Sequence, residues 1–215
     1  MMAAQAVPLP INIPHFENLQ LSEPSLIDEL NLSLPLIYSW LINIYDVHLE
    51  LLFRGTEHGF TLPAFHSCID GKGPLLFVVK SAQYNKVFGG YTSKPWTTPA
   101  DTEQKFHYDH NAFIFSLTRK TKHMPFHNQH NAVQHFSTDS LFAFGWGDFG
   151  IKENCDQRDD NYSNFGVTKW TKYTYALPPN FRENSDESYR YFAGAHEFRV
   201  AEVEVYQVKT VINKS

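Results

Sequence analysis

The clearest alternation of hydrophobic and polar positions lies near the end of the chain, in the segment FRVAEVEVYQV at residues 198–208. Successive side chains of a β-strand point to opposite faces of a sheet, so this segment predicts a long strand. A strand of this regularity would tie the C-terminal part of the chain into a sheet. The alternation separates Ala201, Val203, Val205 and Gln207 from Phe198, Val200, Glu202, Glu204, Tyr206 and Val208.

Short apolar runs bounded by turn residues predict further strands. The run LLFVVK at residues 75–80 is continuous, which is typical of a strand buried on both faces. A turn at residues 81–85 would lead into a returning strand at residues 86–92. Other strands are expected at residues 51–53, 112–118 and 189–192. The aromatic residues of segment 142–149 are expected to face the core.

Helical signals are few and short. Ser25 could cap a first short helix, and Pro35 could be the first residue of a second one. Residues 62–69 are predicted as a third helix, which would end before Gly71. In the helix that begins at Pro35, an apolar stripe facing the core would consist of Leu36, Trp40, Ile44 and Val47.

Long polar segments separate the predicted elements. Residues 118–140 and 152–164 are expected to be surface loops. The strands are short, the helices are few, and the strand–helix–strand alternation of parallel sheets is missing. The sequence therefore predicts a mainly β fold with small helices (α+β), organised as an antiparallel β-sandwich. Three prolines mark residues 1–22 as an extended N-terminal arm, and residues 23–215 are expected to form one domain.

Composition narrows the class of protein. Of the 215 residues, 42% are hydrophobic and 15% aromatic, which favours a thick aromatic core. The net charge of −5 argues against nucleic-acid binding, which requires clustered positive charge. No apolar run approaches the roughly 20 residues of a membrane helix, and residues 1–14 lack the pattern of a secretory signal. We therefore expect a cytoplasmic protein with reduced thiols and no membrane insertion.

A series of short motifs gives the chain a family resemblance. Their order and spacing resemble those of the TLDc (TLD) domain, over about residues 25–208, in a version similar to those of protists. The last motif is the predicted C-terminal strand. The motifs are FHSC at residues 65–68, GKGP at 71–74, FGGYTS at 88–93 with Trp96, AFIFSL at 112–117, FGWGDFGI at 144–151 and FRVAEVEVY at 198–206.

The resemblance implies a β-sandwich of the TLDc type and a role in oxidative-stress resistance like that of the oxidation-resistance proteins. For several members it implies direct binding to the vacuolar proton-pumping ATPase, which would bring the chain to organelle surfaces through a protein partner. It implies no catalytic mechanism and no cofactor. The chain would be a member without the additional modules of larger relatives. Two features depart from the family pattern: the histidine-rich segment 123–135 and Trp146.

Carboxylates and glycines are the candidate functional residues of this interaction module. Glu202 and Glu204 share one face of the predicted last strand, and Asp148 completes the best carboxylate set in the chain. We expect these groups to serve structure or partner binding, because no nucleophile motif accompanies them. Glycine pairs within predicted strands indicate bulges or close backbone approach. These pairs are Gly89 with Gly90 and Gly145 with Gly147.

Two alternatives to the interaction module stay open. One is a structural scaffold module in a cytoskeletal or ciliary assembly. The other is an enzyme that uses carboxylates or a thiol, for which Cys155 is the redox candidate because Lys152 and Arg158 are near in sequence and greater exposure is expected. No metal is expected, although spacings of three to five residues make a histidine set a weak candidate. The set consists of His123, His127, His130 and His135.

Overall fold

The computed structural model describes residues 20–41, 47–100, 105–127, 129–168 and 173–210. The helices are α1 (Asp28–Leu41), α2 (Gly55–His58), α3 (Leu62–Ile69) and α4 (Asp186–Tyr189), with a 3-10 turn at Gln129–Asn131. The strands of one sheet are β1 (Gln20–Leu21), β2 (Val47–Arg54), β3 (Leu75–Ser81), β4 (Val87–Thr92), β6 (Phe113–Ser116), β7 (Thr121–His123) and β13 (Val200–Thr210). Those of the other are β5 (Lys105–His107), β8 (Val133–His135), β9 (Ser140–Phe144), β10 (Phe149–Lys152), β11 (Asn161–Ser163) and β12 (Glu197–Phe198).

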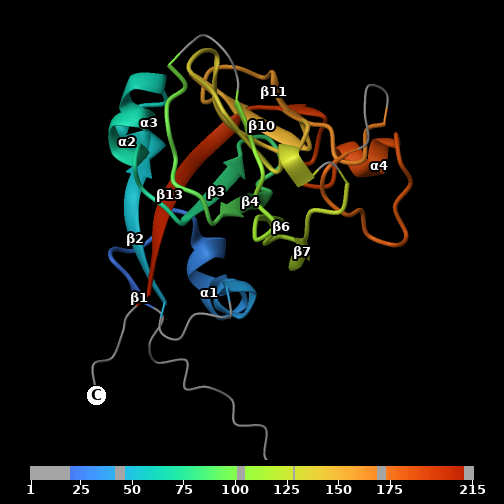
Figure 1. Cartoon of the computed structure of the whole chain (residues 1–215). Coiled ribbons are helices and arrows are strands. Elements are labelled where there is room, and N and C mark those ends of the chain that lie inside the picture. Colours follow the sequence, from blue (N-terminus) through green and yellow to red (C-terminus); the bar gives the residue numbers. More distant parts are fainter. Residues whose placement is uncertain (1–19, 42–46, 101–104, 128, 169–172, 211–215) are drawn as a thin grey trace, which may run out of the picture.

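The two sheets pack against each other as a sandwich (Figure 1). The seven-stranded sheet has the order β1-β2-β13-β3-β4-β6-β7, and the six-stranded sheet has the order β12-β11-β10-β9-β8-β5. Neighbouring strands are antiparallel, except that β1 runs parallel to β2. The predicted antiparallel β-sandwich with small helices is confirmed.

Aromatic side chains fill the space between the sheets. Phe77 of β3 packs against Phe142 and Phe144 of β9, with ring centroids 4.7 and 5.6 Å apart. Phe65 of α3 and Trp96 extend this cluster at one side of the sandwich. Burying one aromatic side chain contributes several kcal/mol, at about 25 cal/mol for each Å² removed from water. The aromatic core, the strand at residues 75–80 and the helix at residues 62–69 are confirmed.

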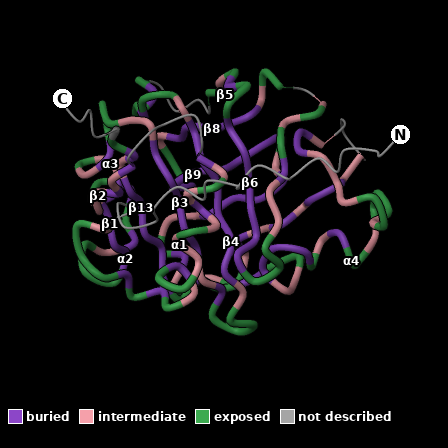
Figure 2. Tube along the Cα trace, turned by 90° about the horizontal axis from the view of Figure 1, so that it is seen from below, coloured by how far each residue is buried: buried purple, intermediate pink, exposed green. Residues whose placement is uncertain are grey.

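Helix α1 covers the outer face of the seven-stranded sheet, on the side away from β10 and β11 (Figure 1). Leu30, Ile37 and Leu41 are its buried residues, and they pack on β3, β4 and β6. The middle strands of the seven-stranded sheet are therefore buried on both faces. Exposed positions gather at the periphery of the molecule (Figure 2). This burial explains the continuous apolar run of β3.

Two predictions for this helical region are wrong. Pro35 lies inside α1 and does not begin a second helix. Packing of the buried side chains of α1 on the sheet outweighs the cost of an internal proline, which is about 3 kcal/mol. The expected stripe also differs: Leu36 and Trp40 are half-buried, and Val47 belongs to β2. Ile44 lies outside the described residues.

Strand β13 follows the predicted alternation with two interruptions. Val203 and Val205 face the core between the sheets, and Tyr206 faces α1. The register shifts between Val200 and Glu202 along β3, and again between Val205 and Tyr206 along β2. Val200 therefore packs with Val203 in the inner core, and not on the face of Tyr206 as strict alternation predicts.

Both segments predicted as long loops contain strands. β7 and β8 lie within residues 118–140, and β11 lies within residues 152–164. Each is three residues long, which is too short for alternation to be visible in the sequence. The strand predicted at residues 189–192 is wrong, because helix α4 ends at Tyr189 and a turn follows.

The described chain begins with β1, which extends the sheet beside β2. Residues 1–19, most of the expected arm, lie outside the described residues. The division into an arm at residues 1–22 and a domain at residues 23–215 stays a prediction. None of the helices in the described ranges is long and apolar enough to cross a membrane.

Candidate functional site

Glu204 and Arg54 form a buried ion pair on the outer face of the seven-stranded sheet. They are directly opposed in β13 and β2, and Glu204 Oε1 lies 2.8 Å from Arg54 Nε. The side chains are 0% and 3% exposed. Arg54 Nη1 also contacts Glu57 at 2.8 Å and Glu23 at 3.2 Å. The guanidinium therefore lies among three carboxylates, two of which reach solvent.

Glu204 also holds the segment that precedes α1. Its carboxylate accepts hydrogen bonds from the Leu26 N–H at 3.0 Å, from the Tyr206 hydroxyl at 2.8 Å and from the Ser25 hydroxyl. The Ser25 Oγ accepts the Ile27 N–H at 2.8 Å, so it links Glu204 to the backbone just before α1. These donors and Arg54 occupy the carboxylate oxygens of Glu204, so Glu204 holds the segment before α1 against the sheet.

The Glu202 carboxylate is also held by hydrogen-bond donors, and two of them belong to Thr56 at the beginning of α2. Its carboxylate accepts the Thr56 N–H at 3.2 Å and the Thr56 hydroxyl at 2.5 Å, and it accepts the Val203 N–H at 2.9 Å. Burial raises the pKa of Glu202, and the three donors oppose this effect. Asp148 lies elsewhere, between β9 and β10 of the other sheet, so the three carboxylates do not form one set.

Asp148 closes the tight turn that contains Gly145 and Gly147, whose φ angles are +70° and +82°. Its carboxylate folds back onto Gly145, where a Cβ would collide with it. Oδ2 accepts the Thr174 N–H at 3.0 Å, while Oδ1 is buried and has no partner among the described residues. Burial raises the pKa of Asp148 to about 7, and the backbone N–H donors oppose this effect.

Thr174 connects Asp148 to the molecular surface. Its Oγ1 accepts the Trp146 N–H at 3.0 Å, and its carbonyl oxygen accepts the N–H groups of Phe126 and His127 at 2.7 and 3.0 Å. Trp146 is 44% exposed and Phe126 is 64% exposed. Trp146 is thus the exception in segment 142–149, where the other large aromatic residues face the core as predicted. Nothing in the sequence singles out Thr174.

Gly89 and Gly90 permit close approach within β4. A Cβ on Gly90 would lie 2.5 Å from the Phe144 ring across the sandwich. A Cβ on Gly89 would overlap the Phe77 carbonyl of the neighbouring strand. The pairing of β3 with β4 runs without a register shift, so of the two readings of this motif, close approach is confirmed and the bulge is wrong.

The order of these motifs along the fold agrees with a comparison against known families. Residues 16–209 match the TLDc domain, which is nearly the whole chain. The chain belongs to the TLDc domain family. This is a family of protein-interaction modules related to oxidative stress. No significant match to a curated protein is found.

Cys155 of this TLDc domain is buried, so the expected exposure is wrong. Burial raises the pKa of its thiol well above the ordinary value, and the nearby Asp156 carboxylate adds to this effect. The two cations expected to activate it have other partners. Lys152 Nζ and Arg158 Nη2 lie 2.9 and 2.7 Å from the carboxylate of Asp160. The site therefore favours the protonated, unreactive thiol.

The four candidate histidines of the TLDc domain lie in different environments. His123 is buried, with Nδ1 2.8 Å from the Ala176 carbonyl and Nε2 3.1 Å from the Thr121 hydroxyl. His127 packs against Phe126 and Tyr173, and His130 packs against Tyr108. His135 lies inside the sandwich. No group of three potential metal ligands occurs within the described residues.

Sequence reasoning missed a buried stack around His135. Its ring lies 3.9 Å from that of Trp96 and 4.0 Å from that of His107, measured between centroids. Burial lowers the pKa of His135 to about 3, and His107 adds to this effect. The Nε2 atoms of both histidines and Trp96 Nε1 have no hydrogen-bond partner among the described residues. This stack joins β5 to the core of the sandwich.

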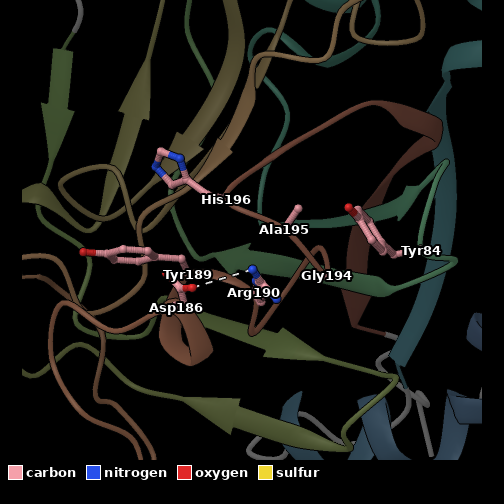
Figure 3. A pocket seen from close by; sticks show the side chains of 7 residues that line it. All are labelled: Tyr84, Asp186, Tyr189, Arg190, Gly194, Ala195 and His196. Carbon is pink, nitrogen blue, oxygen red and sulfur yellow. Dashed lines mark ion pairs between the residues drawn. The ribbon is translucent and has the colours of Figure 1, made fainter.

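A pocket of about 260 Å³ opens between the β3–β4 turn and α4 (Figure 3). Tyr84 packs against Gly194 on one side, and Tyr189 and His196 form the other. Arg190 lies between them and pairs with Asp186 at 3.6 Å, both side chains being largely exposed. None of the residues predicted as functional lines this pocket of the TLDc domain.

Proposed function

We propose that this TLDc domain is a non-catalytic interaction module in oxidative-stress resistance that binds and regulates the vacuolar proton-pumping ATPase. The observation that carries the proposal is the family match over residues 16–209, because direct binding to this pump occurs in several members. The module would reach organelle surfaces through the pump, and its effect on oxidative damage would be indirect.

The geometry of the candidate residues supports an interaction role over catalysis. The carboxylates of Glu202 and Glu204 are held by internal donors, and each is at most 5% exposed. The Cys155 thiol is buried and its pKa is raised. Groups held in this way maintain the shape of a domain, whereas a nucleophile or general acid must reach its substrate.

The test uses vesicles that carry the vacuolar ATPase. We expect the purified chain to co-sediment with these vesicles and to change their ATP-driven acidification. An established pump-binding TLDc domain serves as the positive control, and vesicles stripped of the pump serve as the negative control. The proposal fails if the positive control binds and this chain neither binds nor alters acidification.

A further inference from the structure

Exposed hydrophobic side chains gather beside β5, at one edge of the six-stranded sheet. Seven large hydrophobic side chains are exposed among the described residues. Four of them belong to this region: Tyr108 directly follows β5, and Met124, Phe126 and Trp146 lie on segments that Thr174 and Ala176 join by hydrogen bonds. The ring of Trp146 stacks on that of Phe106 in β5, with centroids 4.6 Å apart and planes 9° apart. We refer to Phe106, Tyr108, Met124, Phe126 and Trp146 as the aromatic patch.

The backbone beneath the aromatic patch is fixed by buried groups. Thr174 is 0% exposed and binds the backbone of Trp146 and Phe126, and Asp148 binds Thr174 in turn. The Ala176 N–H donates to the Met124 carbonyl at 3.0 Å. Rigid, exposed aromatic side chains bind a partner at low entropic cost, and they are typical anchors of interfaces.

Strand β5 offers backbone groups next to these side chains. It is the last strand of its sheet in the described part of the chain, with β8 as its neighbour on one side. An open strand edge can accept an extended chain from another molecule. Phe106 lies opposite Gln134, on the outer face of the sheet. A strand added to β5 would therefore bring every second side chain beside Phe106 and Trp146.

The charges along this edge indicate the character of the partner. Lys105 on β5 is exposed, as are His110 and His130 beside Tyr108. The nearest carboxylate among the described residues of this edge, that of Asp109, is buried. It accepts hydrogen bonds from the Thr92 hydroxyl, from the Ser93 N–H and hydroxyl, and from the Asn111 N–H. Among the described residues of this edge, the exposed group with a full charge at neutral pH is the Lys105 ammonium, which complements an acidic side chain.

We propose that β5 and the aromatic patch form a docking site for an extended, acidic segment of another protein. The segment adds a strand to the six-stranded sheet, places alternate apolar side chains against Phe106 and Trp146, and sets carboxylates near Lys105. The site is defined by the chemistry of a peptide and does not depend on the vacuolar ATPase being the partner.

The test selects peptides from a phage-displayed library of short random sequences against the purified chain. We expect the enriched peptides to alternate apolar and acidic residues. Synthetic copies should bind the Trp146→Ala variant at least about tenfold more weakly than the original chain. Lys105→Glu should weaken the same peptides, while Tyr84→Ala, which removes a comparably exposed ring outside the patch, should leave their affinity unchanged. Phe126→Ser provides a second patch variant if Trp146→Ala unfolds.

Backbone-methylated peptides distinguish strand addition from simple apolar contact. Methyl groups on alternate amide nitrogens of a selected peptide should abolish binding in one of the two possible phases. If a peptide binds equally well with either alternating set of its amide nitrogens methylated, strand addition is refuted. The proposal is also overturned if the patch variants bind the peptides as tightly as the original chain does, or if the selection enriches basic peptides. Binding to anionic phosphatidylserine vesicles without any enriched peptide would assign the patch to membranes. A concentration-dependent dimer abolished by Trp146→Ala would assign it to a second copy of this chain.

Discussion

Replacing Asp148 with asparagine should change how the stability of the domain depends on pH. The native carboxyl has a pKa of about 7 because it is buried, whereas its ordinary value is 3.8. At a pH between 3.8 and about 7, the native Asp148 carboxyl keeps the proton that it has released in the unfolded state. Native stability supplied by Asp148 is therefore complete below pH 3.8 and is lost as the pH rises toward 7.

The size of this effect follows from linkage. At about 1.4 kcal/mol for each pH unit between pH 3.8 and about 7, the ionised carboxylate costs the native state about 4 kcal/mol at neutral pH. Asparagine is neutral throughout and can still accept the Thr174 N–H. Its amide would occupy the position of Oδ1, which has no partner in the described structure, and this cost does not depend on pH.

The measurement is urea unfolding of the original chain and of Asp148→Asn at intervals between about pH 4 and pH 7.5. The stability of the variant relative to the original chain should rise by about 4 kcal/mol across this range. Asp186→Asn, the same substitution at an exposed position, serves as the matched control. A constant difference for Asp148→Asn, or one that falls as the pH rises, would refute the assigned environment.

The remaining predictions concern other buried groups. Glu204→Ala should reduce the free energy of unfolding by about 3–5 kcal/mol, because it leaves Arg54 buried beside fewer carboxylates. Glu57→Ala, at a half-exposed position, should reduce it by less than about 1 kcal/mol, and urea unfolding measures both effects. Gly90→Ala should cost about 1–3 kcal/mol in the same assay through overlap with the Phe144 ring, and an unchanged midpoint would contradict this packing. In the native protein, Ellman's reagent should label only the partly exposed Cys68 rapidly, and Cys155 should react after unfolding; rapid labelling of both would show that Cys155 is accessible.

Sequence patterns were sufficient where a single local rule decides the structure. The glycine after residues 62–69 and the apolar spacing before it predicted α3 with its observed bounds. The continuous apolar run of β3 arises because α1 covers one face of the sheet and the aromatic core covers the other. In α1, by contrast, burial of Leu30, Ile37 and Leu41 outweighs the proline signal, and this depends on a sheet formed by distant residues.

The candidate sites were less predictable because their partners are distant in sequence. Glu204 was identified, but its role depends on Arg54 and on Ser25, which is 179 residues away. Cys155 is surrounded in sequence by polar residues that face solvent, so its own burial leaves no trace in the pattern. Short strands such as β8 carry too few residues for periodicity to distinguish them from loops.

Asp148 joins the motif that carries the family resemblance to the aromatic patch. The glycine turn and the aspartate belong to that motif, and Trp146 lies between the two glycines of the turn. Because Asp148 holds Thr174, and Thr174 holds the backbone of Trp146 and Phe126, the buried carboxyl fixes the position of the exposed rings. Asparagine preserves this hydrogen bond and alanine removes it. Peptide docking should therefore persist in Asp148→Asn and weaken in Asp148→Ala, which separates the support of the aromatic patch from the charge of the carboxylate.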